Sequence, residues 1–194
     1  MGGVSESAAP AVEPCAAQRV FVASRAAAVE LWGDDGLRDI ATRLPDEIRQ
    51  ALVDSAIIAD RWLPERYVIA WQEAVWLGPS REDETSFRRY IDRVVDAGFG
   101  RVRRLLVNLV TPATLCTRAA ELWGDEHTHG EISAKPDGNL VVIRLRAHPY
   151  VGRATSRLVM AESLRHAASL TRAKHVEERH RLDGDALEVM LTWR

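Results

Sequence analysis

Hydrophobic side chains change their spacing near residue 125 of this chain, and that change limits the folds open to it. Before it, apolar residues recur three and four positions apart, as on one face of a helix, for example Tyr67, Trp71 and Val75. After it, every second residue is apolar, as in Val141 and Ile143, which is typical of a strand with one buried face. The sequence therefore predicts a helical first half and a sheet-forming second half.

Two Asp-Gly pairs predict tight turns inside the second half. Asp137-Gly138 joins strands expected over 128–134 and 140–146, and Asp183-Gly184 joins strands expected over 174–181 and 186–193. A long alanine-rich helix is expected between the hairpins, over 152–171. The fold class is therefore α+β: a helical N-terminal half packed on a C-terminal β-β-α-β-β antiparallel sheet module.

Proline and glycine divide the helical half into several predicted elements. A short strand is expected over 19–22, followed by helices over 24–32, 37–43, 46–55, 64–77, 80–97, 99–109 and 111–123. Pro64 and Thr111-Pro112 are typical helix starts, Ser80 with Asp83 resembles a capping box, and Gly98 is expected to separate two helices. Residues 1–17 are predicted to be a disordered tail, and residues 18–194 a single α+β domain.

Charge and cysteine content limit the cellular setting. A formal net charge of -2 gives no general attraction to nucleic acid or to an anionic membrane. The two cysteines, Cys15 and Cys116, lack the paired spacing of a thiolate metal site, and no signal peptide or membrane-spanning apolar run is present. We therefore expect a cytoplasmic protein with reduced thiols. A basic set on two successive predicted helices is interpreted as a solvated face: Arg88, Arg89, Arg93, Arg101, Arg103 and Arg104.

Four short motifs resemble those of a known protein family. They are Trp62-Leu63-Pro64-Glu65 before a helix, Thr111-Pro112 opening a helix that ends in Trp123, His148-Pro149-Tyr150 after the first hairpin, and a final strand ending in Trp193. Together they resemble a myxobacterial paralogous protein family of similar length, over about residues 20–193. That family has no assigned activity, so the resemblance implies a fold more than a function.

The β-β-α-β-β order after a helical half is also similar to haem–nitric-oxide-binding domains and to vinyl-reductase-type small-ligand domains. The first group implies an imidazole on the helix just before the sheet and a Tyr-x-Ser-x-Arg segment for the haem propionates. The helix expected over 111–123 has no histidine, and Tyr150 is followed by Val151-Gly152-Arg153 instead. The vinyl-reductase type implies clustered cysteines, whereas Cys116 stands alone. We therefore expect no haem and no metal cofactor.

Several residues have the type or spacing of metal ligands or catalytic groups, but a structural role is the favoured interpretation for each. His127-x-His129 has a spacing that metal sites use, but it is interpreted as part of a polar loop. Glu177 and Glu178 are interpreted as part of a charged, solvated edge strand rather than as a general acid or base. The chain has no phosphate-binding loop, dinucleotide fingerprint, nucleophile elbow or zinc-protease motif, so no catalytic residue is assigned.

Three functions remain open on sequence alone. The first is a non-enzymatic regulatory or sensory domain that binds a small apolar ligand or a protein partner. The second is an interaction scaffold that forms a homodimer, and the third is an enzyme that uses His148, Tyr150 and Arg153 where the sheet leads into the long helix. The candidate ligand-binding residues are these three together with Trp62 and Trp76, the tryptophans least clearly assigned to a core.

Overall fold

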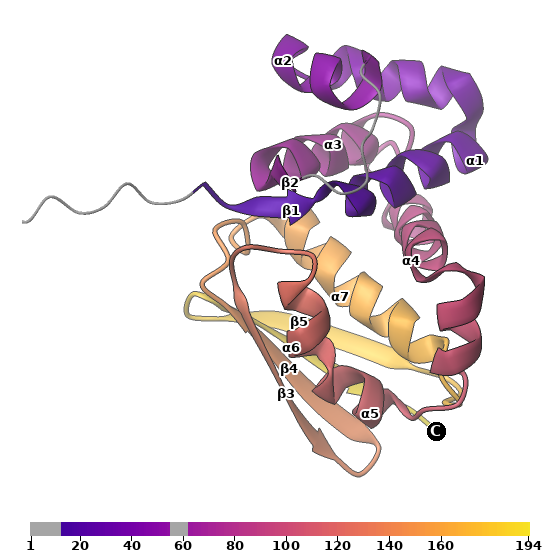
Figure 1. Cartoon of the computed structure of the whole chain (residues 1–194), viewed down its shortest axis with the longest axis vertical. Coiled ribbons are helices and arrows are strands. Elements are labelled where there is room, and N and C mark those ends of the chain that lie inside the picture. The colour runs from indigo at the N-terminus through magenta and orange to yellow at the C-terminus, as the bar shows by residue number, and fades with distance from the viewer. Residues whose placement is uncertain (1–12, 55–61) are drawn as a thin grey trace, which may run out of the picture.

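The computed structural model describes residues 13–54 and 62–194. In chain order its elements are β1 (Cys15–Ala17), α1 (Gln18–Arg43), α2 (Asp46–Arg49), a π-helical turn (Gln50–Asp54), β2 (Trp62–Pro64), α3 (Glu65–Leu77), α4 (Glu84–Val107), α5 (Pro112–Thr117), α6 (Ala119–Gly124), β3 (Glu131–Asp137), β4 (Leu140–Arg146), α7 (Ala154–Ser169), β5 (Glu177–Asp183) and β6 (Ala186–Thr192). In Figure 1, α1, α2 and α3 lie at the top, the four-stranded sheet lies at the bottom, and α7 lies between them. None of the helices in the described ranges has both the length and the apolar composition that a bilayer crossing requires.

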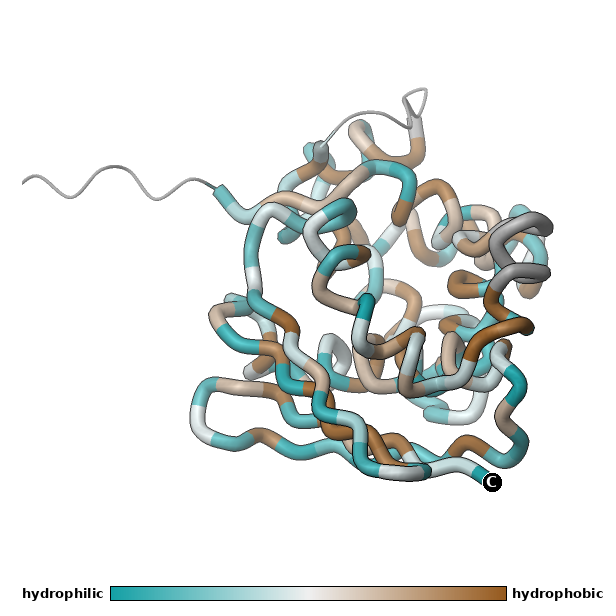
Figure 2. The backbone as a smooth tube through the Cα atoms, turned by 60° about the horizontal axis from the view of Figure 1, so that its bottom comes forward, coloured by the Kyte–Doolittle hydropathy of each residue, from teal (hydrophilic) through white to brown (hydrophobic). Residues whose placement is uncertain are grey.

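The C-terminal sheet confirms the predicted α+β class and the β-β-α-β-β order. Its strands are antiparallel in the order β3-β4-β6-β5, and each hairpin turns at a glycine with positive φ, Gly138 at 57° and Gly184 at 65°. Brown and teal segments alternate along these strands in Figure 2, as the period of 2 predicts. The residues of β4 and β6 that share the buried face are Val141, Ile143, Leu145, Leu187, Val189 and Leu191.

Helix α7 joins the two halves of the fold because it takes part in two hydrophobic clusters. Leu158 belongs to the cluster of the helical half, whereas Ala161 and Ala168 belong to the cluster that the sheet forms with α5. The predicted helix after Pro64 is confirmed as α3, and its predicted face, Tyr67, Trp71, Ala74 and Val75, is buried in the first cluster. Small residues on α7 let its backbone approach the sheet closely, as expected from its alanine content.

The N-terminal part of the chain differs from the prediction. The strand expected over 19–22 is wrong, because α1 begins at Gln18 and the strand, β1, lies at Cys15–Ala17, where it pairs with β2. Phenylalanine and valine favour strands, but Phe21 and Ala28 fall on the face of α1 that is buried in the helical cluster, and tertiary burial outweighs local propensity.

The disordered tail predicted over 1–17 needs a correction at its end. Cys15–Ala17 are part of strand β1, because their backbone groups find partners on two other segments. Residues 1–12 lie outside the described ranges, and the single domain over 18–194 remains a prediction.

Glycine positions were only partly informative about helix ends. Gly33 has φ 63° and ψ -162° and makes a kink inside α1, between the two stretches predicted as separate helices. Helix α4 continues through Gly98, so the predicted break between two helices at this residue is wrong. A glycine inside a helix costs about 1 kcal/mol relative to alanine, and the packing of α4 against α1 and α7 outweighs that cost.

The helix starts are set by single side chains. Asp83, rather than a box that includes Ser80, caps α4, since its Oδ2 accepts the Ser86 backbone N–H at 2.7 Å. Thr111 caps α5 as predicted, but this helix stops at Thr117 and α6 follows it. Three members of the predicted basic set, Arg101, Arg103 and Arg104, have side chains outside the described residues.

Buried charges connect α4, α7 and β5. Arg88 of α4 donates hydrogen bonds to Glu162 of α7 and, at 3.3 Å, to Glu178 of β5. Arg165 donates to Glu162 at 2.8 Å and to Asp92 at 3.0 Å. The side chains of Glu162 and Glu178 are only 1% and 4% exposed. Strand β5 is therefore a charged and mostly exposed edge strand, as expected from its composition, except that the Glu178 side chain is buried.

His166 makes this network sensitive to pH. Its two ring nitrogens lie 3.1 Å from Asp92 Oδ1 and 3.1 Å from Asp96 Oδ1. Burial alone would lower the pKa of His166, but hydrogen bonding to the two carboxylates outweighs it, so the pKa is raised.

A raised folded pKa predicts how stability depends on pH. The His166 contribution should be fully present below about pH 6.5, the ordinary histidine value, and should be lost as the pH rises through the higher folded pKa. Urea unfolding from pH 6 to pH 9 should show a decline in the free energy of unfolding that is smaller in His166→Asn. The control His175→Asn, at an exposed position, should show the same decline in the free energy of unfolding as the wild type. A decline in His166→Asn as large as in the wild type would refute the assignment to His166.

Candidate functional site

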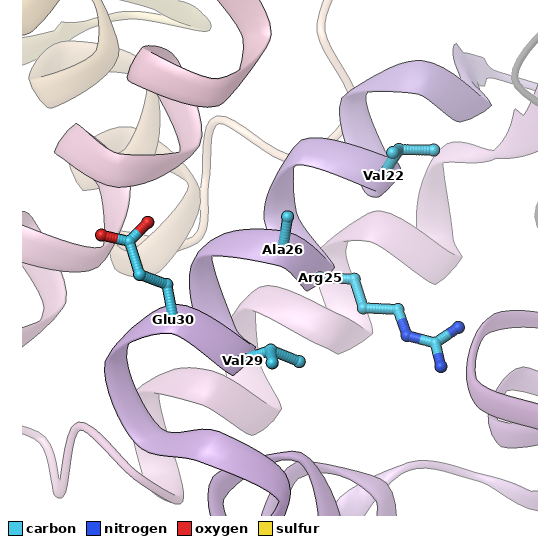
Figure 3. A pocket seen from close by; sticks show the side chains of 5 residues that line it. All are labelled: Val22, Arg25, Ala26, Val29 and Glu30. Carbon is cyan, nitrogen blue, oxygen red and sulfur yellow. The ribbon is translucent and has the colours of Figure 1, made fainter.

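Two surface hollows stand out, and the first is an apolar strip on α1. It is lined by Val22, Arg25, Ala26, Val29 and Glu30. Figure 3 shows the three apolar side chains along the helix, with Arg25 and Glu30 extending to either side. None of the five contributes a buried polar atom without a hydrogen-bond partner. The strip offers apolar contact area but no group that would orient a ligand.

The second hollow, called the junction hollow below, lies where several loops meet. Its volume is about 530 Å³ and it is open to solvent. His129 and His148 are the two imidazoles that line it. The remaining lining residues come from before β1, from the loop after β4, from the end of β5 and from the turn that follows it: Pro14, Ala147, Pro149, Val151, Gly152, Leu182, Gly184 and Asp185.

Behind this hollow lies a histidine–glutamate cluster made of Glu65, His127, His129 and His148. His127 Nδ1 lies 3.4 Å from Glu65 Oε2, and His148 Nε2 lies 3.8 Å from Glu65 Oε1. The rings of His129 and His148 have centroids 4.7 Å apart. One ligand atom each from Glu65, His129 and His148 lie within 4.8 Å of one another. The cluster therefore brings an acid from the helical half next to three imidazoles of the sheet half.

Strand β1 holds the cluster segments in place through backbone hydrogen bonds. Glu65 N–H donates to Pro14 O at 2.8 Å, which fixes the start of α3. Thr128 N–H donates to Cys15 O at 3.0 Å, and Ala17 N–H donates to Glu126 O at 2.8 Å. Ala16 also pairs with His127 in an isolated bridge. The chain just before α1 thus joins the start of α3 to the loop that carries His127 and His129.

Several polar atoms of the cluster have no hydrogen-bond partner. His148 Nε2 and both ring nitrogens of His129 are buried and unpaired, whereas Glu65 Oε2 and His127 Nδ1 lie 3.4 Å from each other. The His148 Nδ1 accepts a hydrogen bond from the Tyr150 backbone N–H at 3.2 Å, so the neutral His148 ring carries its proton on Nε2. Buried polar groups in folded proteins are nearly always paired, and so many unpaired atoms in one place indicate a binding site.

The electrostatics of the cluster suit a cation. Burial alone would raise the pKa of Glu65, but the neighbouring imidazoles, His127 first, outweigh it, so the pKa lies below its usual value. Burial lowers the pKa of His148 to about 4 and also lowers the pKa of His129, although Glu65 acts in the opposite direction on both. At neutral pH the cluster therefore presents a buried carboxylate beside two neutral imidazoles.

Of the residues proposed from sequence, only His148 belongs to the cluster. Tyr150 lies at its edge, with a ring centroid 6.1 Å from that of His148. Arg153 pairs with Glu73 of α3, and its guanidinium carbon lies 5.8 Å from the centroid of the Tyr150 ring. Tyr150 thus lies near both His148 and Arg153, and the enzyme that would use these three residues stays a prediction.

The two candidate tryptophans lie elsewhere. Trp62 of β2 is 47% exposed. Trp76 is partly buried and packs edge-to-face on Phe87 in the helical cluster, with centroids 5.2 Å apart. Trp123 packs against the cluster of the sheet, stacks on His127 with ring centroids 3.9 Å apart, and donates its Nε1–H to His129 O at 2.7 Å. The aromatic residue that contacts the histidines is therefore neither of the two tryptophans proposed from sequence.

Sequence reasoning missed Glu65 and set aside His127 and His129. The His127-x-His129 spacing was a usable signal for a site, but it does not predict that His148 and Glu65 lie next to these histidines in the fold. Glu65 entered only as the last residue of the Trp-Leu-Pro-Glu motif, and a glutamate at the first position of a helix is common because it suits the helix dipole.

Gly130 is expected to be necessary for the cluster. Its φ is 78°, and an added Cβ would lie 3.2 Å from Trp123 Nε1 and 3.2 Å from Leu145 Cδ1. Gly130→Ala should lower the free energy of unfolding by about 1–3 kcal/mol through backbone strain and should also displace Trp123. Gly138→Ala is the control, because it has a positive φ but nothing within 4 Å of the added atom. Equal losses in the two variants by urea unfolding would show that the Trp123 contact is unimportant.

Comparisons with known proteins give a fold but not a family. No protein-family model matches the sequence, and no curated protein matches it. Among solved structures, the chain is similar to an H-NOX protein from S. oneidensis in the Fe(II) ligation state, with a TM-score of 0.66 and 12% identity over 91% of this chain and 95% of that one. It is also similar to an oxygen-binding H-NOX domain related to soluble guanylate cyclases, with a TM-score of 0.62 and 10% identity over 92% and 95%. An unliganded Fe(II) H-NOX protein mutant from K. algicida has a TM-score of 0.64 at 8% identity over 91% and 96%.

A haem, which this fold implies, does not fit the described residues. Haem iron needs an axial ligand, and the porphyrin needs an apolar space. Helices α5 and α6 contain no histidine, and Cys116 of α5 is packed in one cluster with Val141, Ile143 and Leu145 of the sheet. Burial raises the pKa of the Cys116 thiol to about 11. The junction hollow is open to solvent. The chain thus shares the α+β fold of the H-NOX structures, and its buried histidine, His148, lies with His127, His129 and Glu65 rather than on α5 or α6.

Proposed function

We propose that this chain is a sensory or regulatory domain that binds a small polar ligand in the junction hollow, between its helical and sheet halves. The observation that carries the proposal is the convergence of Glu65, His129 and His148 beside a hollow open to solvent, with unpaired ring nitrogens on both histidines. The fold likeness supports a sensory role, since the similar structures are described by their Fe(II) and oxygen complexes. The ligand is proposed to be polar, where the sequence suggested an apolar one, because two imidazoles line the hollow and the Glu65 carboxylate lies next to them.

The location of the cluster supports a regulatory role. Its members come from α3 in the helical half and from loops next to β3 and β4 in the sheet half. If the protein has two conformations that differ in the contacts between α3 and these loops, the two halves of the fold are placed differently in each conformation. A ligand that contacts both halves shifts such an equilibrium by its differential affinity for the two states.

Native mass spectrometry of protein purified from cells under non-denaturing conditions tests the proposal. A bound mass of defined stoichiometry is expected in the wild type and in His175→Asn, an exposed histidine outside the cluster, and it should be absent in His148→Asn. The same spectra report a homodimer, which the 47% exposure of Trp62 favours as the second candidate. Protein without any bound mass, whose melting temperature no added ligand class changes, would refute the binding role.

A further inference from the structure

The donor set of the cluster identifies a ligand class. We infer that Glu65, His129 and His148 bind one divalent first-row transition-metal ion, for which Zn²⁺ is the natural probe. This inference rests on the proposed function and names the ligand at the same site. One donor atom from each of the three residues already lies within 4.8 Å of the others.

The unpaired atoms give the first argument. His148 Nε2 and both nitrogens of His129 have no hydrogen-bond partner, and the side chains of Glu65 and His148 are 3% and 0% exposed. A buried polar group without a partner destabilises the folded state. A single cation that takes one electron pair from each residue supplies a partner to His148 Nε2 and to one His129 nitrogen at once.

The chemistry of the donors decides between kinds of cation. Ca²⁺ and Mg²⁺ take oxygen ligands, whereas two imidazoles with one carboxylate suit Zn²⁺ and its first-row neighbours. A tetrahedral zinc site with bonds of about 2.1 Å holds its ligand atoms about 3.4 Å apart. The His148 Nε2 to Glu65 Oε1 separation of 3.8 Å is close to that spacing, and the three donor atoms, which lie within 4.8 Å of one another, must move closer together to reach it.

The surroundings provide an entry path and an outer shell. His129 and His148 line the open junction hollow, so an ion can enter from solvent and its fourth position can hold water or an added ligand. His127 lies 3.4 Å from the second oxygen of Glu65 and is held by stacking on Trp123. Trp123 also fixes the backbone of His129 by its hydrogen bond. Such outer contacts orient metal ligands.

Metal binding would be coupled to the loop after β4. The His148 ring now accepts the Tyr150 N–H on Nδ1 and carries its proton on Nε2. A metal on Nε2 displaces that proton, and a neutral ring then carries one on Nδ1, which can no longer accept from Tyr150. The turn must therefore rearrange. Ala147, at φ 50°, begins this segment, and Arg153, which pairs with Glu73 of α3, follows it, so the change reaches the helical half.

The test is zinc titration of full-length, chelator-stripped protein by calorimetry, with metal content from elemental mass spectrometry. One Zn²⁺ per chain is expected in the wild type and in the control His175→Asn. His129→Asn and His148→Asn should bind more than about 100-fold more weakly, which exceeds the loss expected from an outer-shell partner alone. His148→Asn is chosen because the Asn oxygen can replace Nδ1 as acceptor for Tyr150 while Nε2 is removed. Glu65→Gln, which keeps the shape of the side chain, should also weaken binding.

The outcomes separate this inference from the proposed function. Zinc binding that both histidine variants abolish, with faster hydrogen exchange of the Tyr150 amide in the zinc-bound wild type, supports the metal site and its coupling. Absence of zinc binding, or binding that the cluster variants do not weaken while their circular dichroism stays native, overturns it. If zinc fails but native spectra show an organic ligand that His148→Asn removes, the proposed function stands without the metal.

Discussion

Replacing Trp71 with alanine is expected to lower the free energy of unfolding by about 3–5 kcal/mol, the range for a buried tryptophan. The Trp71 side chain is fully buried and packs edge-to-face on Phe21, with ring centroids 4.7 Å apart. Its Nε1–H donates to the Tyr90 hydroxyl at 2.9 Å inside the core. The substitution therefore removes packing from α1, α3 and α4 together. Domains of this size are stable by about 5–15 kcal/mol, so the variant should melt far below the wild type.

Two other substitutions serve as controls for Trp71. Trp62→Ala changes the same residue type on exposed β2 and should have little effect on stability. Tyr90→Phe keeps the ring but leaves the indole N–H buried without an acceptor, which should cost about 1–3 kcal/mol. Urea unfolding measures all three. A loss from Trp71→Ala no larger than that from Trp62→Ala would contradict the assigned core.

The periodic parts of the fold were predictable from sequence because one face of each element is buried. The face of α3 that carries Tyr67 and Trp71, and the alternation of Val141 and Ile143 in β4, follow directly from apolar spacing. The Asp-Gly pairs fixed both hairpins, because their glycines adopt the positive φ that such turns need. The fold class followed from these local signals alone.

The errors came from residues whose local preference competes with tertiary contacts. The Phe21 segment favours a strand by composition but forms part of α1, because the helix buries Phe21 and Ala28 against the helical half. A glycine such as Gly98 favours a helix end, but Gly98 lies inside α4, which packs against α1 and α7. Nothing in the local sequence reports such contacts.

The candidate site was the least predictable part, since its residues are far apart in the chain. His148 was identified, and the His127-x-His129 spacing was noticed, but Glu65 joins them only because β1 pairs with both the start of α3 and the loop after α6. Trp62 and Trp76 were chosen as aromatic candidates, while Trp123 is the one that contacts the cluster. A site assembled by short strands and loops leaves no periodic trace in the sequence.

The helical and sheet halves are joined by polar contacts at two places along α7. The histidine–glutamate cluster lies near its start, beyond the loop that carries His148 and Arg153, and the charges around Glu162 lie in its middle. The first place has unpaired polar atoms and an open hollow, whereas in the second the acids are paired with arginines. This difference is why we assign binding to the first and stability to the second.

Replacing Arg88 with methionine is therefore expected to destabilise the protein by about 3–5 kcal/mol, the range for a buried ion pair that loses one partner. Arg88 donates to Glu162 and Glu178, whose side chains are almost fully buried. Without it, Glu178 keeps its contact with His180, at 2.6 Å, and Glu162 keeps Arg165, but each carboxylate has lost a cationic donor. Methionine retains most of the apolar stem of the side chain, so the loss measured by urea unfolding reports mainly the charge.

A double substitution distinguishes a broken pair from a poor fit of methionine. Arg88→Met with Glu162→Leu removes both members of the ion pair. The double variant should lose less free energy of unfolding than the sum of the losses in the two single variants, because no carboxylate at position 162 is left without Arg88. Arg38→Met, which breaks an exposed pair with Asp35, should change little, as surface ion pairs usually do. Additive losses from the two buried substitutions would mean that Arg88 stabilises the interface by packing, and that the charges at the middle of α7 are not coupled.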